Sequence, residues 1–400
     1  MDFSKEIEFA RKHKGDDPIK LLLKQSKYPE IDIKFVAQQL EGQRQASAKW
    51  PRLSRCENFA YPPKLNREQS SSEQTANYKV QAILKDFPSD ETISIADLTG
   101  GMGIDSIAFA SQEDYITQVE YCEMDPILVK LMEYNTNILQ LANIHCHQGD
   151  AIEWLRKDNR HFNIIYIDPA RRDRQGNKTK AFEDCTPNIL DVLPLLEEHC
   201  DYLVIKASPM IDISIAAKQL RNVNDIYIIS VKGECKEVLF VCSNKKQEYA
   251  YHCVNCLLSD KQEFDFTIKE EERANIPICQ TVAKYLYEPN ASIMKGGCYK
   301  LIGERYTLTV LGKNTHLYTS DTLIENFPGR IFEIIQDVAL NKKAVLKLIP
   351  EKKAHVISRN FPIEAAKLQQ QIGLTEGGNL FIIATTVGST KSGFLCRLVR

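Results

Sequence analysis

The middle of the chain alternates short apolar runs with segments of helical periodicity. Each run is five or six residues long and is bounded by polar residues. Such runs, separated by helical segments, are typical of the buried strands of a largely parallel sheet with helices on both faces. The pattern predicts an α/β fold with a doubly wound sheet over residues 78–245. Strands are expected at residues 93–97, 118–123, 162–167 and 202–206.

Two further apolar runs, residues 226–231 and 237–242, are separated by a short turn that contains Gly233. Parallel strands need a long crossover, whereas so short a connection joins antiparallel neighbours. We therefore expect the sheet to end in an antiparallel strand.

The first 77 residues predict a helical domain. Helical runs occur at residues 19–23 and 35–40, and Pro62, Pro63 and the serines at 70–72 mark a connector to the sheet.

The C-terminal part predicts two small α+β domains, residues 246–335 and residues 336–400. In the first we expect strands at residues 263–268 and 306–311 and a helix near residues 280–287. In the second we expect a helix near residues 363–372. Its strands are expected at residues 344–349, 354–358, 380–384 and 394–398.

A glycine-rich turn follows the first strand of the sheet. The strand ends at Asp97, and Gly100, Gly101 and Gly103 precede a helix. A turn this tight needs positive φ, and without a Cβ a cofactor can lie directly on the backbone. A dinucleotide fingerprint would have a third glycine where Ser106 stands. Asp97 also suits a cationic amino group better than a pyrophosphate.

Three later strand ends carry acids as well. Glu123 could bind ribose hydroxyls, Asp150 could accept from an adenine amino group, and Asp168 precedes Pro169. Any one of these acids could be a helix cap or a solvated loop residue. Because the carboxyl ends of parallel strands meet at one edge, we expect all of them in one ligand site.

In order and spacing, these four segments resemble the motifs of class I S-adenosylmethionine-dependent methyltransferases. The resemblance implies a Rossmann-like sheet and S-adenosyl-L-methionine as cofactor. The positions that it implies for cofactor binding are Asp97, Thr99, Gly100, Gly101, Gly103, Glu123, Met124, Asp150, Ala151 and Asp168.

Residues 71–79, 233–237 and 358–362 are similar to recurrent segments of a bacterial methyltransferase family with a THUMP-like C-terminal domain. This resemblance covers nearly the whole chain and implies that the two C-terminal domains are ferredoxin-like and THUMP-like. THUMP-like domains bind RNA, so the resemblance implies structured RNA (tRNA or rRNA) as partner. A shorter part of the chain is also similar to enzymes that methylate the exocyclic N2 of guanine in RNA caps.

The acceptor that fits best is an exocyclic amine of a base. Methylation of pyrimidine C5 usually needs a cysteine, and neither residues 168–171 nor residues 206–209 contain one. An amine proton could point at Asp168 or at a backbone carbonyl of the turn that follows it. We expect Asp168, Pro169 and Arg171 to be the catalytic residues. Arg171 replaces the aromatic ring of the Asp-Pro-Pro-aromatic motif, and a guanidinium can stack on a base or clamp a phosphate, so the acceptor atom stays open.

Composition limits the possible location of the protein and its possible ligands. No run of roughly 20 apolar residues could span a membrane, and residues 1–6 lack the apolar core of a secretion signal. Twelve scattered cysteines suit a reducing cytoplasm. Cys253 and Cys256 have no second pair at zinc-like spacing, so no metal is expected.

The net charge of −2 is unevenly distributed. Residues 1–90 carry +3, residues 336–400 carry +6 and the centre carries −11, which suggests flanking domains that hold a polyanion. Residues 43–67 combine six cations with Trp50, Phe59 and Tyr61. They could bind phosphates and unstacked bases, or the aromatic rings could pack inward.

Two other functions remain open from the sequence. The chain could methylate a protein or a small molecule, with its basic ends merely solvated. It could also be an RNA-binding module on an inert methyltransferase fold, although the retained acids argue against that.

Overall fold

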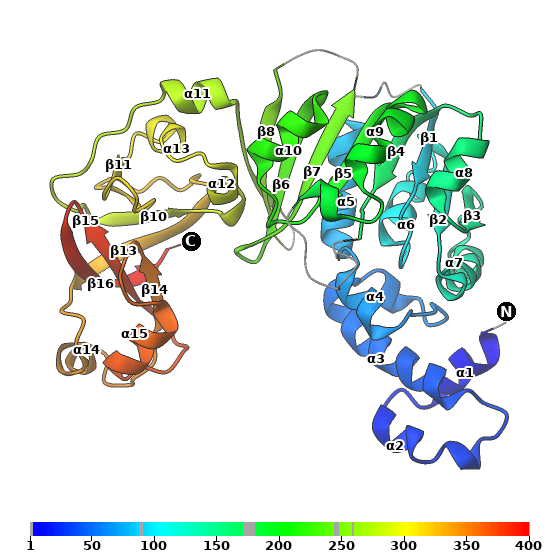
Figure 1. Ribbon diagram of the computed structural model, residues 1–400. Coiled ribbons are helices and arrows are strands. Elements are labelled where there is room, and N and C mark those ends of the chain that lie inside the picture. Colours follow the sequence, from blue (N-terminus) through cyan, green and yellow to red (C-terminus); the bar gives the residue numbers. More distant parts are fainter. Residues whose placement is uncertain are drawn as a thin grey trace. The chain divides into compact units, whose positions relative to one another are not determined.

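The computed structural model describes residues 3–85, 87, 91–170, 181–243, 248–257 and 260–399. The chain forms two compact units (Figure 1). Unit 1 comprises Met1–Ile226 with Glu237–Gln247, and unit 2 comprises Tyr227–Lys236 with Glu248–Arg400. Strands β6 (Val223–Val231) and β7 (Glu234–Ser243) contribute residues to both units. The finer division into four domains stays a prediction.

Unit 1 contains the doubly wound sheet that the apolar runs predicted. Its strands follow the order β3-β2-β1-β4-β5-β7, and β6 is the next neighbour of β7. Strands β1 to β5 are parallel, and β7 is antiparallel to β5, so the expectation of an antiparallel strand after the parallel ones is confirmed. The strands are β1 (Ile93–Asp97), β2 (Ile116–Glu123), β3 (Ile144–Gln148), β4 (Phe162–Ile167) and β5 (Cys200–Ala207).

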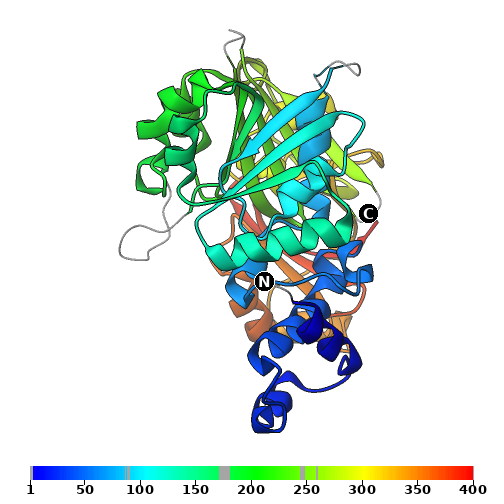
Figure 2. The same ribbon diagram turned by 90° about the vertical axis from the view of Figure 1, so that its right-hand side faces the viewer.

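Helices cover both faces of this sheet. In Figure 2 the green helices α9 and α10 lie on one side of the strands and the blue helix α5 lies on the other. Helix α5 packs against α6. The helices are α5 (Glu73–Leu84), α6 (Ile104–Ala110), α7 (Pro126–Leu139), α8 (Ala151–Lys157), α9 (Ile189–Glu198) and α10 (Ile213–Leu220), with the 3₁₀ turn η3 (Phe182–Asp184).

The N-terminal segment is helical, as predicted. Asn135 on α7 ties it to the sheet domain, because its amide donates to Ala60 O (2.9 Å) and accepts from Ala60 N (2.8 Å). Phe3 and Ile7 pack in the same cluster as Leu128 of α7. The elements are α1 (Ser4–Lys12), α2 (Pro18–Leu22), η1 (Gln25–Lys27), α3 (Ile33–Lys49), η2 (Leu53–Arg55) and α4 (Lys64–Gln69).

The aromatic residues of the basic segment 43–67 pack inward. Trp50, Phe59 and Tyr61 are 0–3% exposed, and the indole N–H of Trp50 donates to Ser71 O at 2.8 Å. Arg67 is buried as well and forms an ion pair with Glu41 at 3.3 Å. The hypothesis that these rings stack on RNA bases is therefore wrong, because buried rings offer no free face.

Unit 2 is α+β, with two separate sets of paired strands. Strands β8 and β9 pair antiparallel, and seven further strands form a sheet of order β11-β12-β10-β13-β16-β15-β14. The strands are β8 (Ala250–Cys256), β9 (Lys261–Phe266), β10 (Tyr285–Pro289), β11 (Thr309–Val310), β12 (Tyr318–Ser320), β13 (Gly329–Asp337), β14 (His355–Arg359), β15 (Leu380–Val387) and β16 (Thr390–Leu398). The helices are α11 (Ile268–Arg273), α12 (Ala291–Gly296), α13 (Leu301–Arg305), α14 (Lys342–Leu348) and α15 (Ala365–Ile372).

Three local predictions in unit 2 are wrong. Residues 280–287 do not form a helix, because residues 285–287 belong to β10, which lies between β12 and β13. Residues 344–349 lie mostly in helix α14 rather than in a strand, since Asn341 caps the helix and Val345 and Ile349 are buried one turn apart. Residues 306–311 supply only the two-residue strand β11, because Tyr306 ends α13 and Thr307 has φ +52°.

Gly42 on α3 offers a test of the packing in the N-terminal segment. A Cβ at this position would lie 2.4 Å from Cβ of Tyr61, so we expect Gly42→Ala to lower the free energy of unfolding by about 1–3 kcal/mol despite alanine's better helix propensity. Gly15→Ala is the matched control, because a Cβ there meets nothing within 4 Å. Tryptophan fluorescence in urea reports on unit 1, which holds both tryptophans, Trp50 and Trp154. Equal stability of the two variants would contradict this packing.

Candidate functional site

The glycine turn after β1 is as tight as the sequence predicted. Gly103 N donates to Gly100 O at 2.8 Å, and Gly101 and Gly103 have φ of +54° and +78°. A Cβ at Gly100 would lie 2.1 Å from the ring of Tyr121 on β2. The turn therefore requires glycine for two separate reasons, the positive φ and the close approach of a neighbouring strand.

Asp97 lies beneath this turn and is only 1% exposed. Its Oδ1 accepts from Thr99 N at 3.1 Å, and its Oδ2 accepts from the Ser106 hydroxyl at 2.5 Å. Burial raises the pKa of Asp97 to about 7, although both hydrogen bonds oppose the shift. Ser106, which interrupts the dinucleotide fingerprint, is thus the residue that holds the acid in place.

Glu123 at the end of β2 joins three loops at the edge of the sheet. Its Oε2 accepts from Gly101 N and its Oε1 accepts from Asp125 N, both at 2.9 Å. Its backbone carbonyl accepts from Gly149 N at 3.0 Å. Met124 is 66% exposed beside it.

Asp150 is exposed and caps helix α8, which begins at Ala151. Its Oδ1 accepts from Ile152 N at 2.8 Å and from Glu153 N at 3.1 Å. One carboxylate oxygen therefore has a structural role, and the other, which makes no hydrogen bond to the described residues, is available for a ligand.

Asp168 follows β4, next to the glycine turn. Its backbone N–H donates to the Thr99 hydroxyl at 2.6 Å, and its Oδ2 forms an ion pair with Lys206 Nζ at 2.6 Å. Pro169 is buried beside it. Arg171 lies outside the residues that the structure describes.

Behind Asp168 lies a buried charged cluster, which we define as Lys79, Lys206, Asp105, Asp168 and Glu237. Lys79 is 2.9 Å from Asp105 Oδ1 and 3.2 Å from Glu237 Oε1. The hydroxyls of Ser71 and Tyr166 donate to Asp105 Oδ2 at 2.9 and 3.0 Å. Burial opposes the charge on Asp105, but the two lysines prevail and hold the pKa of Asp105 below its usual range. In the same way, burial opposes the charge on Lys206, and the three carboxylates raise its pKa.

The sequence analysis did not assign a role to any cluster member except Asp168. Signals were nevertheless present: the recurrent segments 71–79 and 233–237 contain Lys79 and Glu237, and Lys206 is a charge at the end of an apolar run. The residues converge only in the fold, because they come from α5, α6, β5 and β7 and from the end of β4.

The predicted acids therefore lie along one edge of the sheet. Strand β1 lies between β2 and β4, so Asp97, Glu123 and Asp168 end neighbouring strands, and hydrogen bonds from Gly101 and Thr99 join them. The strand order reverses between β1 and β4, and ligands bind at such a switch point in open α/β sheets.

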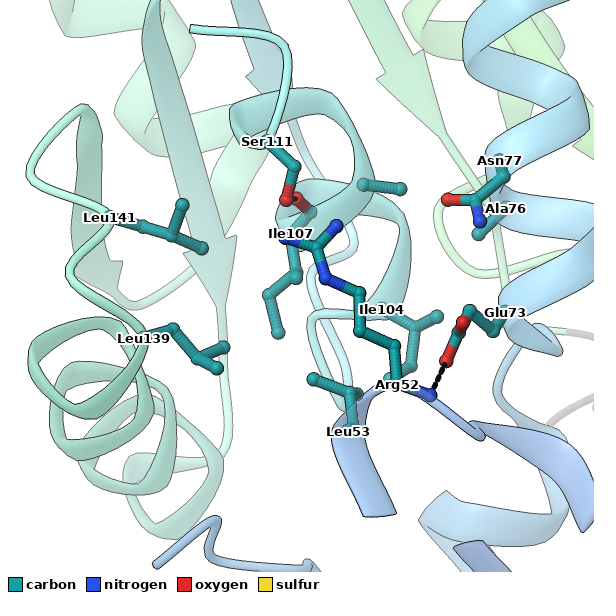
Figure 3. A pocket seen from close by; sticks show the side chains of 11 residues that line it. Arg52, Leu53, Glu73, Ala76, Asn77, Ile104, Ile107, Ser111, Leu139 and Leu141 are labelled. Atoms are coloured by element: carbon teal, nitrogen blue, oxygen red, sulfur yellow. Dashed lines mark hydrogen bonds between the residues drawn. The ribbon is translucent and has the colours of Figure 1, made fainter. Parts of the chain in front are cut away.

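A separate pocket of about 60 Å³ lies between η2, α5, α6 and the end of α7 (Figure 3). Apolar side chains such as Leu53, Ile107 and Leu141 line it, and the Arg52 backbone N–H donates to Glu73 across one side at 2.8 Å. None of the positions predicted to bind the cofactor lines this pocket.

Unit 2 holds an open groove of about 640 Å³ over the recurrent segment 358–362. Arg359, which lines the groove, forms an ion pair with the buried Glu288 at 2.7 Å. Asn360 has φ +48°, and its carbonyl accepts from the Thr386 hydroxyl at 2.5 Å. The groove therefore has a fixed backbone.

Neither a metal cluster nor a membrane-spanning helix occurs in the described ranges. Histidine, cysteine and carboxylate side chains do not gather there in groups of three that could hold a metal ion. The helices of the described ranges lack the length and apolarity that a bilayer crossing needs.

Comparison with known proteins agrees with this architecture. Family models described as a ferredoxin-like domain and as THUMP domain-like match residues 285–328 and 329–398. The crystal structure of a "putative methyltransferase" from Porphyromonas gingivalis W83 is 29% identical and superposes with a TM-score of 0.86, covering 100% of this chain and 98% of that chain.

Curated relatives match a shorter part. A tRNA (guanine(26)-N(2))-dimethyltransferase of Methanococcus maripaludis is 30% identical over 121 residues, 29% of this chain and 31% of that protein. Its counterpart from strain C5 is 27% identical over 119 residues. The chain thus spans about a third of the length of these relatives. Together, the sheet order, the family models and the full-length structural match show that the chain has the fold of class I methyltransferases, with ferredoxin-like and THUMP-like domains at its C-terminal end.

Proposed function

We propose that this protein transfers a methyl group from S-adenosyl-L-methionine to an exocyclic amine of a base in structured RNA. The observation that carries the proposal is the similarity to tRNA (guanine(26)-N(2))-dimethyltransferases, whose target atom is an exocyclic amine. The Asp168-Pro169 pair at the sheet edge supports the same chemistry.

The donor set of the edge fits this cofactor. Glu123 would accept from the ribose hydroxyls and the free oxygen of Asp150 from the adenine amine. Asp97 would favour the cationic amino acid end, and the Gly101 and Gly149 backbones leave room, since a Cβ at Gly149 would meet nothing within 4 Å. When bound, the cofactor supplies an activated methyl group on a positively charged sulfur.

The protein's part in the transfer is alignment. Asp168 would accept an N–H of the amine, which turns the nitrogen lone pair toward the methyl carbon. The lone pair forms the new nitrogen–carbon bond while the electrons of the sulfur–carbon bond return to sulfur. The nitrogen is then positively charged, and its proton leaves through Asp168, which is 25% exposed in its side chain, to water.

The RNA partner is supported by the C-terminal part of the chain. Residues 336–400 carry a net charge of +6, and the THUMP domain-like match covers residues 329–398. Arg359 and Phe361 line the groove there, and guanidinium and aromatic side chains are groups that bind phosphates and unstacked bases.

Tritium transfer from labelled S-adenosylmethionine to RNA from cells that lack this gene tests the proposal. We expect the wild-type protein to label one RNA band, and Asp168→Ala to reduce turnover by roughly 100-fold or more while it binds the cofactor normally. Asp201→Ala is the matched control, since Asp201 lies near the opposite end of β5 and is 52% exposed in its side chain.

RNase treatment completes the experiment. Loss of the label after RNase, together with a low rate for Asp168→Ala, would establish RNA methylation and allow the nucleoside to be identified. Label in protein or in small molecules would instead show that the substrate is a protein or a small molecule and not RNA. Full activity of Asp168→Ala would remove this residue from the mechanism.

Asp97 generates a second prediction, on stability and pH. Its folded-state pKa of about 7 exceeds its ordinary value of 3.8, so its contribution to stability falls as the pH rises from 3.8 to 7. The cost is about 4 kcal/mol above pH 7. Asp97→Asn keeps the shape but removes the charge, so in urea it should be more stable than wild type, increasingly so as the pH rises from about 4 to about 7.

Cofactor binding should change in the opposite direction. Calorimetry should show that wild-type affinity increases from about pH 6 to about pH 7.5, because a cationic ligand favours the ionised acid, and that Asp97→Asn binds at least roughly tenfold more weakly. Asp212→Asn, an exposed cap of α10, should alter neither property. A less stable Asp97→Asn at pH 8 would show that this carboxylate is not strained.

A further inference from the structure

Asp168 and Lys206 are neighbours because of strand register. Strands β4 and β5 are parallel and pair Ile167 with Ile205, so the next residues along, Asp168 and Lys206, face each other across the sheet. Partners in a ladder point to the same face, and here they meet at 2.6 Å. The contact is therefore built into the backbone of the sheet.

Lys206 is held firmly behind the acid. It is 3% exposed, and it donates to Asp168 Oδ2 and to the Ser71 hydroxyl, the latter at 3.1 Å. Glu237 and Asp105 lie 3.7 and 3.8 Å from its nitrogen. An ammonium surrounded in this way has little freedom to rotate, so the oxygen that it bonds is fixed in space.

The other lysine of the cluster has a different set of partners. Lys79 contacts Asp105, Glu237, Ser71 and the Tyr166 hydroxyl, which are all deep in the protein. Asp168, in contrast, is 25% exposed in its side chain. Within the described residues, Lys206 is the cation of the cluster that reaches this partly exposed acid.

We propose that Lys206 is the positioning residue of the methyl transfer: it holds Asp168 by Oδ2 so that Oδ1 faces the acceptor amine. The inference rests on the proposed function. Among the described residues the structure gives Oδ1 no hydrogen-bond partner, so the amine would meet one oriented acceptor instead of a carboxylate that rotates.

Asp168 has to align the amine and does not have to remove its proton before the transfer. A strong base is not needed, because the amine proton becomes acidic only after the nitrogen has taken the methyl group. Lys206 stays protonated throughout, and the proton leaves by way of Asp168.

Several groups surround the pair and share its electrostatics. They are Lys79 from α5, Asp97 from β1, Asp105 from α6, Tyr166 from β4 and Glu237 from β7. A test must therefore separate the loss of one cation from the loss of this particular contact.

Lys206→Met and Lys79→Met form a matched pair for that purpose, because each removes one buried ammonium. We expect both variants to be less stable than wild type. Lys206→Met should bind S-adenosylmethionine within about twofold of wild type, yet its kcat should fall roughly 100-fold, as misplacement of an aligned group does. Lys79→Met should lower kcat much less than Lys206→Met does, because Lys79 contacts Asp105 and Glu237 and not Asp168, and Lys206→Arg should restore part of the rate.

A double variant keeps the test valid if Lys206→Met alone fails to fold. Lys206→Met with Glu237→Gln removes one charge of each sign and so keeps the balance of the cluster. If Lys206 had a purely structural role, the double variant would recover wild-type kcat, which would overturn the inference. A persistently low kcat with normal cofactor binding supports it.

Crystal structures separate this inference from the proposed function. If the wild-type protein methylates no RNA, the proposed function fails, but the orientation of Asp168 can still be compared between wild type and the double variant. A rotated carboxylate in the variant supports a positioning role for Lys206, and an unchanged carboxylate overturns it.

Discussion

The pairing of charges in the buried cluster is the constraint on which the site depends. Two lysines and three carboxylates lie together behind the sheet edge, and charges at such depth are tolerated only in close pairs. Removal of one partner from a buried pair costs about 3–5 kcal/mol. Because the members come from α5, α6, β5, β7 and the end of β4, each element fixes the others, and Lys206 connects Asp168 to the rest of the cluster.

Asp97 is a buried carboxylate that has no cation beside it among the described residues. It is as deeply buried as the lysines, but its partners are a hydroxyl and a backbone N–H instead of a cation, so its pKa rises to about 7. A buried carboxylate without a cation lowers the stability of the fold. It also favours the binding of a cationic ligand, since the ligand supplies the positive charge that the carboxylate lacks. The stability of unit 1 and its proposed affinity for the cofactor are therefore opposed at this residue.

The sequence predicted the strand ends well because they follow a local rule: an apolar run, then an acid or a glycine turn, lies at the ligand edge of a parallel sheet. Asp97, Glu123 and Asp168 lie there, although their roles toward a cofactor stay predictions. The role of Lys206 could not be predicted by such a local rule, because it depends on contacts with residues that are distant in sequence. The prediction of a strand at residues 344–349 is wrong because a short apolar run fits a strand and a helix equally well. Asn341 caps the segment as a helix. The sequence left open whether Trp50 is exposed or buried, because residue type alone does not determine burial.

The balance of charge at the edge favours the substrate form of the proposed cofactor over its product. Asp97, Glu123 and Asp150 add carboxylates to a cluster in which three acids already face two lysines, so the site as a whole is anionic. S-adenosylmethionine carries a sulfonium, and its product carries a neutral thioether. The electrostatic attraction therefore weakens when the methyl group leaves. Such a site favours exchange of spent for fresh cofactor. Attraction to the sulfonium alone stabilises the ground state and does not lower the barrier, so the rate has to come from the alignment that we propose for Asp168 and Lys206.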